Sequence, residues 1–340
     1  MSTPALDHSL AATLERLIRR DPARRGLIGS ETDREPLCAS HLSAAIDHLV
    51  RGGQSAWILT GFYIPAGQPP AAETDGPPGA ALLAATLRAC GMDVRLVTDE
   101  PCRTAVTVAA ELYGLPSAVV ECCPVLPAEA DGWLQNLAID PSLSHVICVE
   151  RVGPSHTPAS WGALRVAVSA AGRFANAVPD EHWDRCHNMR GEIIEGWTAP
   201  LHRLVERIAG ERPGVKTIGI GDGGNELGLG AVPWRELRDR LSGPAAPLVP
   251  CRIATDWTIL AGVSNWGAMA LAAGIAHGRG CTEALRPWNR DAEEQRLRQL
   301  VARGPAVDGV TRLREPTVDG LPFLTYIQPW EGMRQRLGLE

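Results

Sequence analysis

Residues 217–230 read Thr-Ile-Gly-Ile-Gly-Asp-Gly-Gly-Asn-Glu-Leu-Gly-Leu-Gly, and this stretch decides how the chain is interpreted. Its short apolar start predicts a strand that runs into a glycine-rich turn. Glycine permits positive φ and close approach of the backbone to a ligand, and Asp222, Asn225 and Glu226 add polar groups to the turn. The stretch predicts a ligand or metal site; the alternative is a structural turn in which Asp222 caps the next helix.

The two acids of this turn limit the class of ligand. A loop that cradles phosphate normally offers backbone N–H groups and a basic residue, and no P-loop lysine follows here. Asp222 and Glu226 instead suit a divalent cation (Mg²⁺, Mn²⁺ or Ca²⁺) or a substrate with an ammonium group, and Gly223 and Gly224 would let that substrate approach the backbone. The glycine spacing does not continue as a dinucleotide fingerprint. We expect neither NAD nor pyridoxal phosphate as a cofactor.

Composition excludes several classes of partner. The chain has 340 residues, 45% of them hydrophobic, and a net charge of −6, so it can bury a sizeable core and has no long-range attraction for nucleic acid or an anionic membrane. No run approaches the ~20 apolar residues that a membrane span requires. The nine cysteines follow no framework spacing, which predicts reduced thiols and a cytoplasmic protein.

Short apolar runs alternate with segments of helical periodicity along the whole chain. This alternation predicts an α/β fold: a largely parallel sheet flanked by helices, a three-layer sandwich with loop insertions. Because no linker or internal repeat interrupts it, we expect one domain over residues 1–340. The predicted strands are residues 56–60, 94–98, 118–122, 146–149, 217–220 and 252–254.

Three polar motifs follow predicted strands: residues 73–79, residues 221–226, and residues 255–256 together with 263–267. The carboxyl ends of parallel strands share one edge of the sheet, where ligands bind. The motifs therefore predict one acidic pocket. Its expected members are Glu73, Asp75, Asp222, Glu226 and Asp256.

Each flanking motif also has a structural interpretation. Asp75 before two prolines is a good helix N-cap, and Ser264 and Asn265 are common caps as well. Arg151 and Arg190 could hold a substrate carboxylate in bidentate fashion, although an arginine near a loop is more often a surface group. These alternatives stay open on sequence alone.

Taken together, these motifs resemble the D-glutamate cyclase family, in order along nearly the whole chain. The resemblance implies a stand-alone cyclase domain that converts D-glutamate to 5-oxo-D-proline and water, a lyase reaction. The sequence departs from the family pattern at Val152, at Cys186-His187 and at Leu229. The segments that carry the resemblance are Thr60-Gly-Phe, residues 73–79, Thr98-Asp-Glu, Glu150-Arg151, Asn188-Met-Arg-Gly191, residues 219–230, Thr255-Asp256, residues 263–267, residues 14–18 and 21–26, and Asp319-Gly-Leu.

The chemistry of such a cyclisation fits an acidic pocket. The α-amine must lose a proton before it attacks the γ-carboxyl carbon, and that carboxyl must lose an oxygen as water, so both a base and a proton donor or cation are needed. We expect Asp222, Glu226 and Asp256 as catalytic groups and tentative metal ligands, with Arg190 on the α-carboxylate. The expected substrate-binding residues are Glu73, Asp75, Arg151, Asn188, Arg190, Gly223, Gly224, Asn225, Ser264 and Asn265.

Two other functions remain open at this point. Acids at strand ends also suit a metal-dependent hydrolase or phosphatase of a small acidic metabolite, and the same pocket could serve an amino-acid sensor that binds without reaction. The expected partner in each case is a small molecule, foremost an acidic amino acid.

Overall fold

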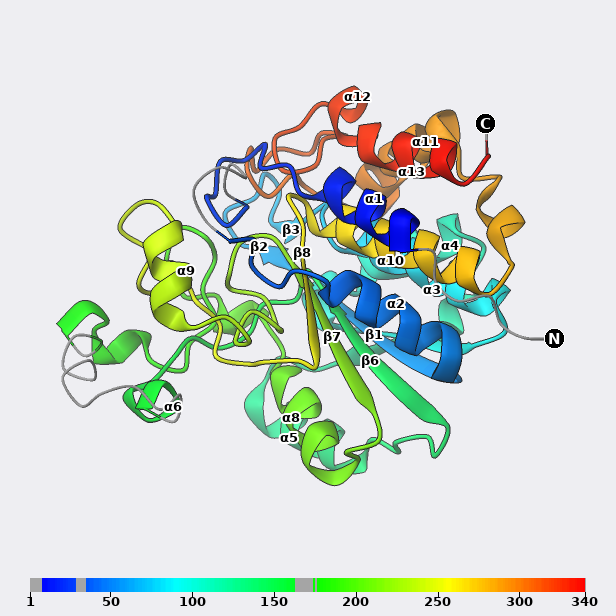
Figure 1. The fold of residues 1–340 in the computed structure, drawn as a ribbon. Coiled ribbons are helices and arrows are strands. Elements are labelled where there is room, and N and C mark those ends of the chain that lie inside the picture. The colour runs from blue at the N-terminus through cyan, green and yellow to red at the C-terminus, as the bar shows by residue number, and fades with distance from the viewer. Residues whose placement is uncertain (1–7, 29–34, 163–173, 175, 340) are drawn as a thin grey trace.

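Parallel strands in the order β5-β4-β1-β6-β7-β8 form the centre of the molecule (Figure 1). The structure is a computed structural model that describes residues 8–28, 35–162, 174 and 176–339. The strands are β1 (Ser55–Thr60), β4 (Asp93–Asp99), β5 (Val120–Cys123), β6 (Leu143–Val149), β7 (Lys216–Gly221) and β8 (Trp257–Leu260), with a separate antiparallel pair, β2 (Tyr63–Ile64) and β3 (Ala71–Ala72).

Helices cover both faces of this sheet, as Figure 1 shows for α2, α3 and α10 on one face and α5 and α8 on the other. Successive residues of β1 point to opposite faces: Ile58 belongs to the core under α3 and α10, whereas Trp57 and Leu59 belong to the core under α5 and α8. The predicted three-layer α/β sandwich is confirmed. The helices are α1 (His8–Ile18), α2 (His41–Gly52), α3 (Pro77–Ala89), α4 (Arg103–Leu112), α5 (Pro127–Asn136), α6 (Pro158–Gly162), α8 (His202–Glu211), α9 (Trp234–Arg240), α10 (Ser264–Gly278), α11 (Arg290–Arg303), α12 (Phe323–Tyr326) and α13 (Gln328–Arg336).

Helix α10 is the central helix of the larger core. Its sequence is apolar and rich in small residues on every side, which is typical of a helix buried all round. Gly274 lies against Ile46 of α2 with no room for a side chain. A disulfide between Cys90 and Cys281 joins the chain just after α3 to the chain just after α10. The prediction that all thiols are reduced is wrong for this pair, while the cysteines at 38, 102, 122, 123, 148, 186 and 251 are free.

The strand order reverses between β1 and β6, and this position determines where a ligand site can form. The chain proceeds from β1 outward to β4 and β5, and then returns to β6 and continues outward to β7 and β8 on the other side. A crevice opens at the carboxyl ends of the two strands where the order diverges. Glu150 follows β6 directly and therefore lies at this crevice.

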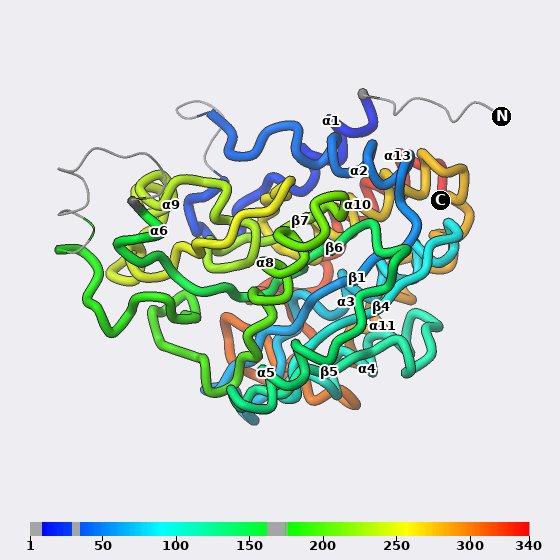
Figure 2. The backbone as a smooth tube through the Cα atoms, turned by 90° about the horizontal axis from the view of Figure 1, so that it is seen from below, coloured from blue at the N-terminus to red at the C-terminus, as the bar shows by residue number. Residues whose placement is uncertain are grey.

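The ends of the chain complete the same edge of the molecule. Helix α1 packs beside α13, and both Figure 1 and Figure 2 show the two helices close together. The loop after α1 and the loop before α12 consequently approach the sheet from one side. Among the described residues, no helix combines the length and apolar character that crossing a membrane requires.

One strand boundary differs from the sequence prediction. Residues 252–254 are not a regular strand; Ala254 makes only isolated bridges to Gly228 and Leu229, and the strand begins at Trp257. Asp256 therefore precedes its strand instead of following one. The error arose because both segments are short and rich in β-branched or aromatic residues, so periodicity does not separate them.

Candidate active site

A pocket of about 450 Å³ opens at the crevice between β1 and β6. Acids from three separate loops line it: Glu73 after β1, Glu150 after β6 and Asp319 before α12. Arg25 lies among these acids. The predicted acidic pocket at the carboxyl edge of the sheet is therefore present, but its membership differs from the prediction.

Glu73 presents an unpaired acceptor to this pocket. Its side chain is 6% exposed, and its Oε1 atom has no hydrogen-bond partner among the residues that the structure describes. Gly309 faces the same carboxylate, and a Cβ atom at that position would lie 2.1 Å from Glu73 Oε2. The glycine thus gives the Glu73 carboxylate the space it occupies.

Asp75 and Asn265 hold the starts of two helices. The N–H groups of Ser264 and Asn265 donate to the Asp75 carboxylate, each at 2.8 Å, at the first turn of α10. Asn265 Oδ1 in turn accepts from the N–H groups of Gly76 (3.0 Å) and Gly79 (2.8 Å) at the first turn of α3. The capping alternative is confirmed for Asp75 and Asn265, although each caps the helix that belongs to the other motif. Both side chains are committed to these contacts and neither lines the pocket.

Glu150 occupies a strained position beside the pocket. Its φ is +44°, a left-handed conformation that residues other than glycine rarely adopt, and strain of this kind clusters at functional sites. The Ser264 hydroxyl donates to Glu150 Oε2 at 2.5 Å. The predicted site residue Ser264 therefore acts on an acid of the pocket, which is itself a residue that the sequence interpretation did not assign to the site.

Glu226 shapes the glycine-rich turn from within. Its carboxylate accepts from the N–H groups of Asp222 (3.2 Å), Gly223 (2.6 Å) and Gly224 (2.8 Å). The backbone N–H groups of Gly223 and Gly224 are consequently occupied, so the prediction that they receive substrate is wrong in this structure. Asn225 donates from Nδ2 to the His187 carbonyl (2.8 Å), while its Oδ1 is buried without a hydrogen-bond partner in the described part of the chain. Asn225 lines the pocket, as predicted.

Arg25 connects acids from distant parts of the chain. Its guanidinium forms an ion pair with Asp222 and donates to both oxygens of Asp319, at 3.1 and 3.3 Å. Asp21 fixes the loop that carries it, because the Asp21 carboxylate accepts from the N–H groups of Arg25 (2.9 Å) and Gly26 (2.8 Å). The segments 21–26 and 319–321 had entered the sequence interpretation only through the family resemblance, and no spacing signal could place them beside Asp222.

Two predicted site residues lie elsewhere. Asp256 is at the amino-terminal edge of the sheet, where its carboxylate accepts from the N–H (2.8 Å) and hydroxyl (2.8 Å) of Thr217 and pairs with Lys216. Its assignment to the acidic pocket is wrong because Asp256 precedes β8. Arg151 is fully buried and bonded to Asp99 (2.5 Å) and to two carbonyls, so its assignment to a substrate carboxylate is also wrong.

Asn188 and Arg190 line the mouth of the pocket, as predicted, together with Arg312. Asn188 Oδ1 accepts from the Arg190 N–H (2.9 Å) and from the Glu192 N–H (3.1 Å), which makes a compact turn that presents Arg190. Arg312 comes from the loop between α11 and α12, which the sequence interpretation left without a role.

The protonation of these acids is shifted by their surroundings. Burial, followed by the negative charges of neighbouring carboxylates, raises the pKa values of Glu73 and Glu150 well above the ordinary range. Burial and the charge of Asp319 raise the pKa of Asp75 to about 7. Burial also raises the pKa of Asp222, and Arg25 opposes that rise. A pocket of this kind retains protons near neutral pH and can donate them.

The acids could also hold a cation. Asp75, Asp222 and Asp319 can each offer one oxygen within 4.8 Å of the others, and so can Glu150, Asp222 and Glu226. Carboxylate oxygens suit Mg²⁺, Mn²⁺ and Ca²⁺, and Asp222 belongs to both triads. The donor set therefore fits the predicted type of cation, with Asp222 as the shared ligand and without Asp256.

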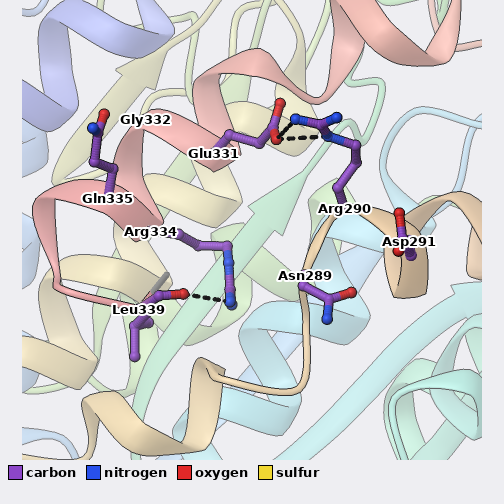
Figure 3. Close-up of a pocket in the computed structure, with 8 residues that line it drawn as sticks. All are labelled: Asn289, Arg290, Asp291, Glu331, Gly332, Arg334, Gln335 and Leu339. Atoms are coloured by element: carbon purple, nitrogen blue, oxygen red, sulfur yellow. Dashed lines mark hydrogen bonds and ion pairs between the residues drawn. The ribbon is translucent and has the colours of Figure 1, made fainter.

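A second hollow, of about 540 Å³, lies between α11 and α13, away from the strand ends (Figure 3). Its charged groups are already paired. Arg290 contacts Glu331, and Arg334 donates to the carbonyls of Leu285 and Leu339. This hollow offers no convergent unpaired group, so the candidate site is the acidic pocket.

Comparison with known proteins agrees with the resemblance of the motifs. Residues 14–328 match the family described as D-glutamate cyclase-like, C-terminal. The chain is 29% identical over 339 residues to a human protein named D-glutamate cyclase, mitochondrial; the match covers 91% of this chain and 49% of the human protein, so the chain spans about half the length of that relative. With its acidic pocket at the strand ends and a family match over nearly its whole length, the chain belongs to the D-glutamate cyclase-like family.

Proposed function

We propose that this protein cyclises D-glutamate to 5-oxo-D-proline with release of water. The observation that carries the proposal is the pocket itself: buried acids with raised pKa values lie deep, and arginines stand at its mouth. Glutamate has a matching distribution of charge, with an ammonium group that acids can receive and carboxylates that arginines can receive. The family match supports the same reaction.

The reaction balances without an outside reagent. The amine nitrogen forms a bond to the γ-carboxyl carbon, and one carbon–oxygen bond of that carboxyl breaks. Two protons leave the ammonium nitrogen and depart with the lost oxygen as water. The protein must therefore accept protons at one position and return them at another nearby.

Glu73 and Glu150 are placed for this transfer of protons. Both line the pocket, and each negative charge raises the pKa of the Glu73 carboxyl in addition to burial. Like charges at such a distance favour one proton held between the two groups, so that one can donate while the other accepts. Glu73 Oε1 is the unpaired acceptor that faces the amine, and Glu150 is fixed by the Ser264 hydroxyl.

Arg25, Asp222 and Asp319 neutralise and orient the inner end of the site. Arg25 lines the pocket and can polarise the γ-carboxyl as negative charge develops on it. A divalent cation held by Asp222 with either of its neighbouring acid pairs would supply Lewis-acid polarisation of the same carboxyl. The enclosed pocket holds amine and carboxyl together, an effect that can contribute ~7–11 kcal/mol in well-oriented intramolecular reactions.

A metal-dependent hydrolase of a small acidic metabolite is the second candidate, because the two carboxylate triads around Asp222 also suit metal-assisted attack by water. It predicts consumption of an ester or amide and no 5-oxoproline. An amino-acid sensor predicts binding of glutamate without any product.

The proposal is tested by incubating chelator-treated protein with D- or L-glutamate, with and without Mg²⁺, Mn²⁺ or Ca²⁺, and following 5-oxoproline by chiral chromatography. We expect product from the D-isomer. Glu73→Gln should lower kcat by about 10²–10⁴-fold, the usual contribution of general acid–base catalysis. Glu294→Gln is the matched control, since Glu294 pairs with Arg298 on the surface of α11. Folded wild-type protein that forms no 5-oxoproline under any of these conditions would refute the proposal.

A further inference from the structure

Arg190 and Arg312 stand together at the mouth of the acidic pocket, and they come from different loops. One contact ties the loops to each other: Arg190 Nη2 donates to the Val310 carbonyl at 3.2 Å. Arg190 is presented by the turn that Asn188 closes. The relative position of the two guanidiniums is therefore set by the fold.

Asp308 builds the loop that presents Arg312. Its carboxylate is fully buried and accepts from the N–H groups of Val310 (2.8 Å), Thr311 (2.8 Å) and Gly320 (2.8 Å) and from the Thr317 hydroxyl (2.7 Å). Arg312 has a left-handed backbone, with φ +65°, and its N–H donates to the Asp308 carbonyl at 2.8 Å. Arg312 is held at the pocket by a hub of hydrogen bonds and by a backbone conformation that costs free energy.

The positive charge of this pair is only partly balanced. The acid that pairs with Arg312 is Glu192, with its Oε2 atom 3.6 Å from Arg312 Nη2 and its side chain 56% exposed. The Nε atom of Arg312 is buried and has no hydrogen-bond partner within the described ranges. Partial burial, and next the positive charge of Arg312, lower the pKa of Arg190. Two guanidiniums in this arrangement form a site for an anion with two acceptor oxygens.

We propose that Arg190 and Arg312 jointly bind the α-carboxylate of the substrate at the mouth of the pocket, and so select amino acids that carry this group over amines that lack it. Assigning the site to the α-carboxylate rests on the proposed cyclisation. Deeper in the pocket, Glu73 Oε1 and Asn225 Oδ1 are unpaired acceptors, which suit the amine. The α-carboxylate is unchanged by the reaction, so the same contact persists from substrate to product.

The test compares ligands that differ in the carboxylate alone. Calorimetry would measure the affinity of the wild type, Arg190→Gln, Arg312→Gln and the double variant for 5-oxo-D-proline and for its carboxamide. Glutarate and glutaramide form a second pair, and they cannot cyclise because they have no amine. Arg298→Gln is the matched control, since Arg298 pairs with Glu294 away from the pocket. Thermal unfolding shows that each variant folds.

We expect the wild type and the control to bind each acid about 10- to 100-fold more tightly than its amide, the range for hydrogen bonds to a charged group. Arg190→Gln and Arg312→Gln should each remove most of this preference. The double variant should lose little more, because the two arginines share one carboxylate. Arg312→Lys should restore part of the preference, since it restores the charge without the bidentate geometry.

An acid-to-amide ratio that stays at the wild-type value in Arg312→Gln, or a wild type without any preference, would overturn the anion site. The cyclisation is judged separately. Protein that prefers glutarate through both arginines but makes no 5-oxoproline from D-glutamate keeps the anion site and loses the proposed reaction. Protein that makes 5-oxoproline with an unchanged ratio in Arg312→Gln keeps the reaction and loses the anion site.

Discussion

Asp75 and Asn265 each cap the helix that begins beside the other: the Asp75 carboxylate accepts from the first turn of α10, and the Asn265 amide oxygen accepts from the first turn of α3. The two helices thereby start at fixed positions behind the pocket. The exchange couples the loop after β1 to the loop after β8, which are far apart in sequence. Rigid support of this kind holds Glu73 and the Ser264 hydroxyl in place.

Asn265→Ala should therefore destabilise the protein more than loss of an ordinary cap. It leaves the N–H groups of Gly76 and Gly79 buried without this acceptor, and we expect the free energy of unfolding to fall by about 2–4 kcal/mol, a cap plus a buried unsatisfied donor. Asn289→Ala is the control, because Asn289 caps α11 through the Ala292 N–H in an exposed position and should cost about 1 kcal/mol. Equal losses for the two variants in urea unfolding would contradict this account.

Arg151→Gln should act on stability and leave substrate affinity unchanged. The Arg151 guanidinium is buried and contacts Asp99, the Gly61 carbonyl and the Ala199 carbonyl. Removing it leaves the Asp99 carboxylate buried without its cation, which typically costs about 3–5 kcal/mol. Urea unfolding would measure this loss, and KM would be measured on the fraction that remains folded. A variant of wild-type stability with a raised KM would return Arg151 to the substrate site.

Asp256→Asn should leave catalysis intact. Asp256 lies at the opposite edge of the sheet from the pocket, where it contacts Thr217 and Lys216. We expect kcat/KM for D-glutamate to stay within about twofold of the wild type, because distant sites rarely couple. Asp222→Asn provides the contrast, since Asp222 pairs with Arg25 and belongs to both acid triads. A large loss of activity in Asp256→Asn with normal stability would show that the edge assignment is incorrect.

The ligand-free protein should become less stable as pH rises. Burial first, then the charge of Asp319, raises the pKa of Asp75 from 3.8 to about 7, and the pKa of Glu73 is raised as well. A carboxyl with a raised pKa binds more protons in the folded state, so its stabilisation is complete below the unfolded pKa of ~4 and is lost as pH rises through the folded value. We expect the free energy of unfolding of chelator-treated protein to fall from about pH 5 to about pH 8.

Glu73→Gln tests the source of this slope, since a neutral amide removes one ionisable group and relieves its neighbours. Unfolding in urea across the same pH range should show a smaller decline for Glu73→Gln than for the wild type. Glu294→Gln, at an exposed ion pair on α11, should leave the slope unchanged. The same slope in all three proteins would mean that the pocket acids do not set the pH dependence.

The Cys90–Cys281 disulfide should stabilise the end of the core opposite the pocket. It closes a loop of 191 residues between the ends of α3 and α10. Reduction, or Cys90→Ser, should lower the free energy of unfolding by roughly 2–5 kcal/mol, because the unfolded chain regains freedom. Thermal unfolding with and without reductant gives the measurement. Cys38→Ser, at a free cysteine, should keep the full response to reductant, whereas Cys90→Ser should lose it.

The sequence by itself determined the alternation of strands and helices and the glycine-rich turn at 221–226. Both are local features: apolar periodicity fixes which faces are buried, and glycines fix where the chain can turn. The positions of Glu73 and Asp222 at strand ends followed from them. The capping roles of Asp75 and Asn265 were open alternatives for the same reason, since cap residues are recognised by type.

Only the tertiary structure decided which charged residues meet. Arg25 and Asp319 reach Asp222 because α1 packs beside α13, a contact between the two ends of the chain that no local pattern specifies. Asp256 faces away because β8 begins three residues later than its sequence pattern indicated. Burial, which is a property of the assembled core, made Arg151 a structural cation and raised the pKa values of the pocket acids.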